Sequence, residues 1–422
     1  MFRPIAVAVL SLILAAPLMA ATRMTYEIHG TPTAIEWASS AFPLKYEIEQ
    51  RLAAVNPSAT AMIDRAFAAW TEIPGTDVRF QSEGVVNGTA ARAADRVAVS
   101  LAGDLFAGQG AVAVTTYTYD VDTGRMLDAD ISVDPSLFDG SMNAQMALQH
   151  EVGHVLGLDH SAVLSSIMYP FVGAGGEPAD FETDDSIAIT NIYPKGDPTL
   201  TGATLSGRVT GDDGGIFAAQ VVAVNATGQP VGSVLTNPAG EFSLAGIPAG
   251  RYRLYAEPLD GPMEPGSLQG TWARASAKSF PTAFFSSPVD VENGKVYGNL
   301  MLSTAGAVTL NPRWIGVTPA GRTDVTLSGS PATVRPGETV MITVAGDGFT
   351  SGMTEFDVIS PSFKRISDYT WAGNYVQASY AVDGAAPGTS AVVVVRSGHE
   401  TATLTGALRV YRASGRSRSV RK

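Results

Sequence analysis

Apolar positions in the first half of the chain recur at two different spacings, which predict a mixed α/β region. Between residues 58 and 72 they follow the three-to-four-residue spacing of a helix face, at Met62, Ile63, Ala66, Phe67 and Trp70, with Ser58 as the predicted N-cap. Short strands are predicted at 44–48, 78–80 and 96–100, and the turn residues 120–125 join 111–119 to 126–134 as a hairpin. A further short helix is expected from 182–187, with a threonine or an aspartate as N-cap. Residues 22–196 therefore read as one α/β domain.

The pattern changes after residue 196, where a short linker is followed by strands and turns alone. Alternating apolar stretches at 205–209, 220–224 and 240–244 are separated by Gly, Pro and Asn turns. Later stretches at 332–344 and 391–396 are also predicted to be strands. The second of them is a continuous apolar run, which is typical of a central strand. We predict two all-β sandwich domains, at 199–303 and 304–411. The irregular stretch 259–285 is expected to pack its aromatic side chains over an open sandwich edge, with a ligand surface as the alternative.

Both ends of the chain differ from the rest. Residues 1–21 carry Arg3, an apolar run and a final alanine-rich stretch, which predicts a secretory signal peptide, with a retained membrane anchor as the alternative. No other stretch is apolar enough to predict a membrane span, so the processed protein is expected to be secreted, extracellular or periplasmic. Residues 412–422 form a basic tail.

The amino-acid composition excludes several kinds of functional site and one class of partner. The formal net charge of −12 argues against nucleic acid as a partner. Cysteine is absent, which excludes disulfides, thiol catalysis and thiolate metal sites. A protein or a peptide is the expected partner, and the β domains could contact a cell surface or a matrix.

Three of the five histidines fall within residues 150–160, in the order His-Glu-x-x-His-x-x-Gly-x-x-His. Positions four apart share a helix face, so His150 and His154 can aim at one point. Gly157 permits a left-handed turn that returns His160 to the same point. Three imidazoles leave one position open on a Zn²⁺ ion for water, and Glu151 can take a proton from that water.

These residues, with the downstream Ser166-Ile167-Met168-Tyr169-Pro170, resemble the metzincin metallopeptidases. Ser161 after the third histidine is similar to the matrixin branch. The resemblance implies zinc ligands at His150, His154 and His160, Glu151 as general base, and Met168 beneath the metal. Competing readings are a core helix whose histidines pair with carboxylates, and an iron site with two histidines and a carboxylate.

The same resemblance implies a substrate-binding edge strand at Val112, Ala113, Val114 and Thr115. An interior hairpin strand is the alternative for this stretch. Tyr169 and Pro170 are expected at the wall of the substrate pocket, although the family's Pro-x-Tyr is only partly matched by Pro170-Phe171-Val172.

The sequence also gives expectations about which metal ions the protein binds. One catalytic Zn²⁺ is predicted, since Ser132 stands where many matrixins carry a histidine for a second, structural zinc. Ca²⁺ could bind an acidic cluster in which Asp134 is the best match to a family ligand, but turn-capping aspartates explain such a cluster as well. The cluster comprises Asp120, Asp122, Asp128, Asp130 and Asp134.

The two C-terminal domains resemble known modules. The stretch Gly240-x-Phe242…Pro248-x-Gly250-x-Tyr252 is similar to carboxypeptidase-regulatory-like, transthyretin-like sandwiches, and 304–411 is similar to bacterial Ig-like modules. The chain thus reads as a secreted zinc metalloendopeptidase with two β-sandwich modules. The alternatives are a surface adhesin with a vestigial peptidase domain, and a narrow processing enzyme with one protein partner.

Overall fold

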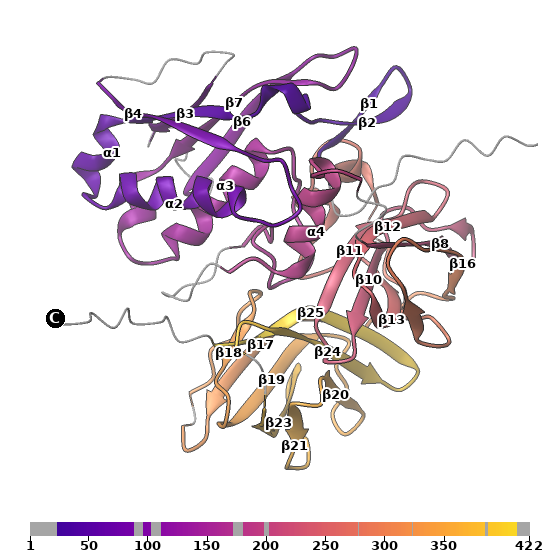
Figure 1. The fold of residues 1–422 in the computed structure, drawn as a ribbon. Coiled ribbons are helices and arrows are strands. Elements are labelled where there is room, and N and C mark those ends of the chain that lie inside the picture. The colour runs from indigo at the N-terminus through magenta and orange to yellow at the C-terminus, as the bar shows by residue number, and fades with distance from the viewer. Residues whose placement is uncertain are drawn as a thin grey trace, which may run out of the picture.

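The computed structural model describes residues 23–87, 96–102, 111–171, 180–197, 202–276, 278–322, 324–384 and 387–411. The predicted signal peptide and the basic tail lie outside these residues. An α/β part, indigo to magenta, lies on one side of the molecule, and two β parts lie on the other (Figure 1). None of the helices in the described ranges is long and apolar enough to cross a membrane.

The α/β part is built on a five-stranded sheet of order β4-β3-β5-β7-β6. β6 alone runs antiparallel to its neighbour, so the predicted hairpin is present and β6 lies at the sheet edge. The strands are β1 Thr25–Ile28, β2 Thr31–Ala34, β3 Leu44–Glu49, β4 Phe80–Val86, β5 Arg96–Leu101, β6 Ala113–Tyr119 and β7 Met126–Val133. The helices are α1 Gln50–Val55, α2 Ala59–Thr71, α3 Ala144–Val155 and α4 Thr183–Ile192, with the short 3₁₀ turns η1 Ser39–Ala41 and η3 Pro135–Phe138.

The apolar face of α2 explains why this helix packs where it does. Ile63, Phe67 and Trp70 are buried, and they join the core that includes β3, β5 and α3. The Trp70 indole donates to the Gln149 carbonyl at 2.8 Å, which fixes α2 against α3. Ser58 occupies the predicted N-cap position, but its side chain makes no capping hydrogen bond.

Two expectations about this part need correction. The strand predicted at 78–80 begins only at Phe80, because Val78 is buried beside Thr76 and hydrogen-bonded to its hydroxyl rather than paired in the sheet. Glu182 is the N-cap of α4, where a threonine or an aspartate was expected. Glu182 and Asp185 each accept from the other's backbone amide in a capping box.

The second module has two facing sheets, of order β11-β10-β13-β14 with β15, and β12-β8-β16 with β9. Its strands are β8 Ala203–Gly211, β9 Gly214–Gly215, β10 Gln220–Asn225, β11 Pro230–Leu235, β12 Glu241–Ile247, β13 Gly250–Glu257, β14 Ala283–Phe284, β15 Val289–Val291 and β16 Val296–Ser303. The irregular stretch between β13 and β14 contains the 3₁₀ turns η5 Pro265–Ser267 and η6 Trp272–Arg274.

The third module also has two sheets, of order β17-β19-β23-β21 with β22, and β18-β25-β24-β20. The predicted central strand is β24, which lies between β25 and β20. The strands are β17 Asn311–Pro319, β18 Ala332–Val334, β19 Thr339–Asp347, β20 Thr354–Ile359, β21 Phe363–Arg365, β22 Thr370–Ala372, β23 Tyr375–Val382, β24 Ser390–Ser397 and β25 Glu400–Val410.

The α/β part and both modules meet around the start of α4 (Figure 1). Glu182 lies 3.4 Å from the Gln229 side-chain amide of the second module and 3.1 Å from the Ser390 hydroxyl of the third. Arg409 of β25 donates to the Ser165 carbonyl at 2.9 Å. Leu164 packs in the hydrophobic cluster of the third module. The β modules therefore support the segment that follows the third histidine.

Candidate metal centre

The end of α3 places two of the three histidines. α3 ends at Val155, and Gly157 follows in the left-handed conformation, with φ +87°. The Leu158 amide reaches the Gly153 carbonyl at 3.1 Å and the Gly157 amide reaches the His154 carbonyl at 3.0 Å, which is a Schellman motif. A Cβ on Gly157 would stand 2.4 Å from the Ile35 carbonyl oxygen, so both conformation and space require glycine here.

Each of the three imidazoles has its Nδ1 atom against a backbone carbonyl. His150 Nδ1 lies 2.8 Å from the Ile167 oxygen and His154 Nδ1 lies 2.8 Å from the Leu158 oxygen. His160 Nδ1 is hydrogen-bonded to the carbonyl of Ser267, which belongs to the second module. A carbonyl only accepts, so each Nδ1 carries the proton and each Nε2 presents a lone pair.

These lone pairs meet at one point. The Nε2 atom of His154 is 3.0 Å from that of His150 and 3.2 Å from that of His160. With the protons on Nδ1, these contacts have no donor, and three facing lone pairs need a cation between them. Nitrogens held at 2.0–2.1 Å by a tetrahedral Zn²⁺ stand roughly 3.3 Å apart, so the site fits that ion. No other group of three or more potential ligand residues occurs among the described residues.

Burial reinforces the neutral state of the ligands. His150 and His154 are 6% and 5% exposed. Desolvation, with a smaller contribution from His160, lowers the pKa of His150 to about 3, and burial lowers the pKa values of His154 and His160 as well. The imidazoles are therefore unprotonated at Nε2 near neutral pH, as metal binding requires.

Glu151, the residue after His150 on α3, is buried and held by the edge strand. The Thr115 hydroxyl of β6 is 2.7 Å from Glu151 Oε2 and 3.0 Å from the Glu151 backbone oxygen. Desolvation raises the pKa of Glu151 to about 7, and the Thr115 hydrogen bond opposes that rise. A carboxyl group with a pKa in this range can both take up and release a proton near neutral pH.

Met168 lies against α3 on the side of Gly153. A Cβ on Gly153 would stand 2.3 Å from the Met168 sulfur and 3.0 Å from the Trp70 ring. Met168 is 2% exposed, so its thioether fills the space that this glycine leaves.

Buried carboxylates hold the chain on both sides of the Met168 turn. Asp184 accepts from the Ser161 hydroxyl at 3.0 Å and from the Ser233 amide at 2.6 Å, and so joins the residue after His160 to the second module. Asp185 accepts from the Ile167 amide at 3.1 Å. That bond holds in place the residue whose own carbonyl faces His150.

The residues expected to bind substrate are only partly brought together. Ala113, Val114 and Thr115 lie on the edge strand, and Val112 directly precedes it. Tyr169 is fully buried, and its hydroxyl donates to the Gly329 carbonyl of the third module at 2.6 Å. Its ring is thus part of a core, not of a pocket wall.

Pro170 stays beside Tyr169 at the end of the turn, half-buried. Phe171 is exposed, and its carbonyl accepts from the Ser330 hydroxyl at 3.2 Å. Val172 of the expected wall lies outside the described residues.

The aspartates considered for calcium have structural hydrogen bonds. Asp120 accepts from the amides of Asp122 and Thr123 within its own turn, at 2.9 and 3.0 Å. Asp134 caps η3 by accepting from the Ser136 amide at 2.8 Å. Capping of local turns therefore accounts for both residues without an ion.

Sequence reasoning missed Ser267 and Gln269 altogether. Their stretch was expected to pack aromatic rings over the sandwich edge, and Phe280 does lie in that module's core. Trp272 instead lies in the cluster shared with the third module, and its indole donates to the Arg23 carbonyl at 3.2 Å. Ser267 contributes only a backbone carbonyl, and it lies 107 positions away from His160 in the sequence. No local sequence motif identifies such a residue.

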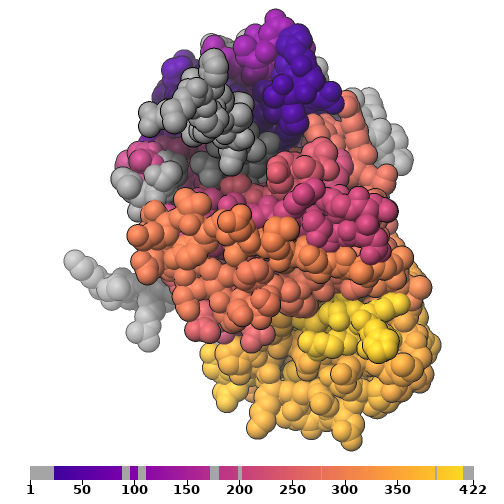
Figure 2. All heavy atoms as spheres, turned by 90° about the vertical axis from the view of Figure 1, so that its right-hand side faces the viewer, coloured from indigo at the N-terminus to yellow at the C-terminus, as the bar shows by residue number. Residues whose placement is uncertain are grey.

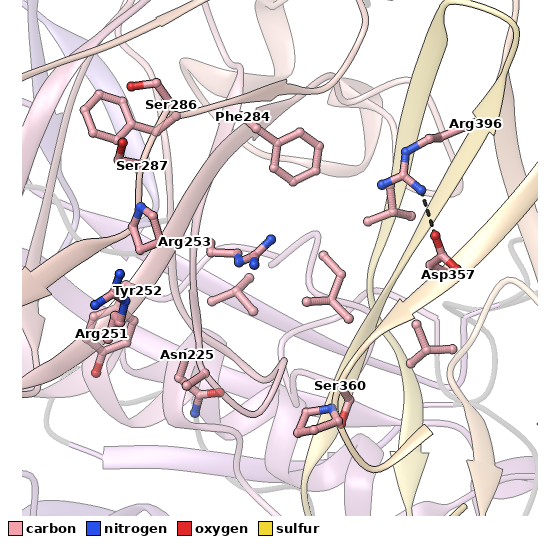
Figure 3. A pocket seen from close by; sticks show the side chains of 18 residues that line it. Asn225, Arg251, Tyr252, Arg253, Phe284, Ser286, Ser287, Asp357, Ser360 and Arg396 are labelled. Atoms are coloured by element: carbon pink, nitrogen blue, oxygen red, sulfur yellow. Dashed lines mark hydrogen bonds and ion pairs between the residues drawn. The ribbon is translucent and has the colours of Figure 1, made fainter. Parts of the chain in front are cut away.

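A cavity of about 830 Å³ lies between the second and third modules, away from the histidines. Arg251, Arg253 and Arg396 line it together with Phe284 (Figure 3). The Arg396 guanidinium is 2.9 Å from Asp357. None of its lining residues belongs to the α/β part, so this cavity is separate from the metal centre.

Comparison with known proteins gives two family matches. Residues 36–194 match the matrixin family (peptidase M10), and residues 204–260 match the carboxypeptidase regulatory-like domain. The chain is 32% identical over 121 residues to Metalloendoproteinase 2-MMP of Arabidopsis thaliana and 28% identical over 170 residues to Metalloendoproteinase 5-MMP of the same plant. It is 34% identical over 98 residues to human Matrilysin.

These alignments cover 26%, 36% and 22% of this chain. They span 32%, 45% and 36% of the relatives' own lengths, which is less than half of each. The similarity therefore does not extend to the whole of this chain or to the whole of any of these relatives.

Proposed function

We propose that this chain, whose residues 36–194 match the matrixin family, is an exported zinc-dependent endopeptidase that hydrolyses peptide bonds in protein substrates. The observation that carries the proposal is the convergence of three imidazoles, in which His154 Nε2 lies 3.0 Å from His150 Nε2 and 3.2 Å from His160 Nε2. Three imidazoles are the ligand set of a catalytic zinc rather than a structural one.

When bound, Zn²⁺ supplies Lewis-acid chemistry, polarising the scissile carbonyl and lowering the pKa of water. Glu151 takes the proton from the attacking water at its carboxylate and passes it to the leaving amine. Thr115 keeps that carboxylate in place through its hydrogen bond to Oε2. Burial of Glu151 excludes bulk water, which strengthens each of these electrostatic effects.

The edge strand β6 is the proposed docking strand for an extended substrate. Its outer edge is unpaired in the described sheet, so an extended peptide can add a strand there by main-chain hydrogen bonds. Thr115 of the same strand touches Glu151, so a peptide on β6 passes the proposed base. Export rests on the signal peptide predicted at residues 1–21, and once outside the cell the β modules could also contact a surface.

A direct test compares the wild type with Glu151→Gln on an unfolded protein such as casein. We expect the wild type to cleave casein and to stop when zinc is chelated. Glu151→Gln should retain its zinc and lose about a hundredfold to ten-thousandfold in kcat/KM, which is the range that removal of a general base costs. Glu241→Gln, an exposed glutamate on β12, is the matched control and should keep full activity. Undiminished cleavage by Glu151→Gln would remove Glu151 from this role.

The adhesin alternative is not favoured, because its premise is a degenerate peptidase site. The three histidines converge, and Glu151 is buried and hydrogen-bonded to Thr115.

A further inference from the structure

The second and third modules are joined by a small hydrophobic cluster between two sheets. Val224 and Tyr255, on β10 and β13, pack there against Val392 and Val394 of β24. The Tyr255 hydroxyl also lies 2.6 Å from the hydroxyl of Thr405. Atoms of the two modules lie directly against each other in the space-filling view (Figure 2). Val224 and Val394 also line the cavity of about 830 Å³, so its floor is apolar and is formed by both modules.

An aromatic ring and a loop form one wall of this cavity. β14 and β15 both pair with β13, and the chain between them, residues 285–288, lines the cavity. Phe284, at the end of β14, is 39% exposed. Its ring centroid stands 5.3 Å from that of Tyr255, which is fully buried. The wall therefore offers exposed aromatic surface on a fixed support, which is a common feature of small-molecule sites.

The charged residues of the lining give the cavity a positive charge. Three arginines, Arg251, Arg253 and Arg396, line it with a single acid, Asp357, which leaves a formal excess of two positive charges in a chain of net charge −12. Asp357 pairs with Arg396 at 2.9 Å, and Asp290 lies 3.4 Å from Arg251. Arg253 has no acidic partner within the described ranges, and its side chain points into the open space (Figure 3). Its guanidinium is therefore available to an anion.

These features together define the chemistry of a ligand. A guanidinium binds a carboxylate through two parallel hydrogen bonds, and the Phe284 ring and the valines of the floor offer apolar surface to the rest of the molecule. A volume of about 830 Å³ lies within the range of roughly 300–1,000 Å³ that is typical of small-molecule sites.

We propose that the cavity between the second and third modules binds a small organic acid with an apolar or aromatic body. Its carboxylate meets Arg253, and its body packs against Phe284. None of the residues that line the cavity belongs to the metal centre, so this site does not depend on the proposed peptidase function.

The test is isothermal titration calorimetry of the full-length chain with 2-naphthoate, which carries one carboxylate on an apolar double ring. We expect a Kd of about 1 mM or tighter. The neutral analogue 2-naphthamide, and acetate, which lacks the ring, should each bind at least about tenfold more weakly. Equal affinity for the amide would refute the anion site, and equal affinity for acetate would refute the apolar contact. No binding of 2-naphthoate would overturn the proposal as a whole.

Two substitutions locate the ligand in the cavity. Arg253→Met keeps the length of the side chain and removes its charge, so it should weaken 2-naphthoate by about tenfold or more and 2-naphthamide by less than about threefold. Phe284→Ala removes apolar surface and should weaken both ligands. Arg208→Met, at an exposed arginine of β8 outside the cavity, is the matched control and should bind as the wild type does. Unchanged binding of 2-naphthoate by Arg253→Met would overturn the proposal.

A third substitution should strengthen binding, which a damaged fold cannot do. Asp357→Asn removes the acid of the lining and frees Arg396, so 2-naphthoate should bind about threefold more tightly, the effect of one unit charge at a distance on the order of 6 Å in a water-like dielectric. Asp324→Asn breaks a similar exposed ion pair, with Arg322 at 2.7 Å, away from the cavity and should leave the Kd unchanged. Weaker or unchanged binding by Asp357→Asn would contradict the placement of the carboxylate in this cavity.

Discussion

Replacing Gly157 by alanine tests how the turn after α3 builds the metal centre. The added Cβ must adopt φ +87°, which costs about 1–2 kcal/mol for an L-residue. It must also find space where the Ile35 carbonyl oxygen stands 2.4 Å away, and relief of such an overlap in a packed region costs roughly 1–3 kcal/mol. We expect Gly157→Ala to lower the free energy of unfolding by about 2–5 kcal/mol in total.

The same substitution should weaken metal binding, because the turn also places the Leu158 carbonyl against His154 and leads into His160. Urea unfolding of the metal-free protein measures the stability term, and competition with a zinc-binding dye measures the affinity. Gly140→Ala is the matched control, since Gly140 has the same φ of +87° but nothing within 4 Å of its added Cβ. It should lose only the conformational term, about 1–2 kcal/mol, and bind zinc normally. If the two variants lose equal stability and both bind zinc normally, the close approach to Ile35 does not shape the site.

Three further substitutions probe other parts of the account. Thr115→Val removes a hydrogen bond that lowers the pKa of Glu151, so the acidic limb of the pH–rate profile should move to higher pH. The value of kcat/KM should fall by about three- to tenfold, and an unchanged pH–rate profile would count against the contact. Burial raises the pKa of Glu257 to about 7, above about 4.3 in the unfolded chain, so this carboxyl destabilises the fold increasingly as pH rises through that window. Urea unfolding should therefore show Glu257→Gln gaining on the wild type between pH 5 and pH 8, by on the order of 3 kcal/mol, whereas a constant difference would refute the cause. Leu164→Ala should lower the free energy of unfolding by about 2–5 kcal/mol, and calorimetry should show that the third module and the α/β part are destabilised together. A loss of stability confined to one unfolding transition would contradict the contact between them.

The metal centre could be predicted from the sequence because its geometry is local. His150, His154 and His160 lie on one helix and one turn, so spacing alone implies that they converge, and Gly157 marks the turn by its chemistry. The hairpin of β6 and β7 was predictable for the same reason, since its turn residues and alternating strands are adjacent in the chain.

What the sequence could not supply depends on contacts between distant segments. Ser267 contributes a backbone carbonyl, which any residue type possesses, so no pattern identifies it. Tyr169 was expected at a pocket wall, but the third module offers its hydroxyl an acceptor at Gly329 and buries the ring. Glu182 caps α4 because it also meets Arg409 and Ser390, which lie more than two hundred positions away.

The central claim is that three imidazoles hold one zinc ion through Nε2. X-ray absorption at the zinc edge, together with metal analysis of the purified wild type, measures this directly. We predict one zinc per chain, with three imidazole nitrogens at about 2.0–2.1 Å, and a loss of that zinc in His154→Ala but not in His29→Ala, whose ring is exposed. Protein that stays metal-free in zinc-replete buffer, or zinc that remains after His154 is removed, would contradict the claim.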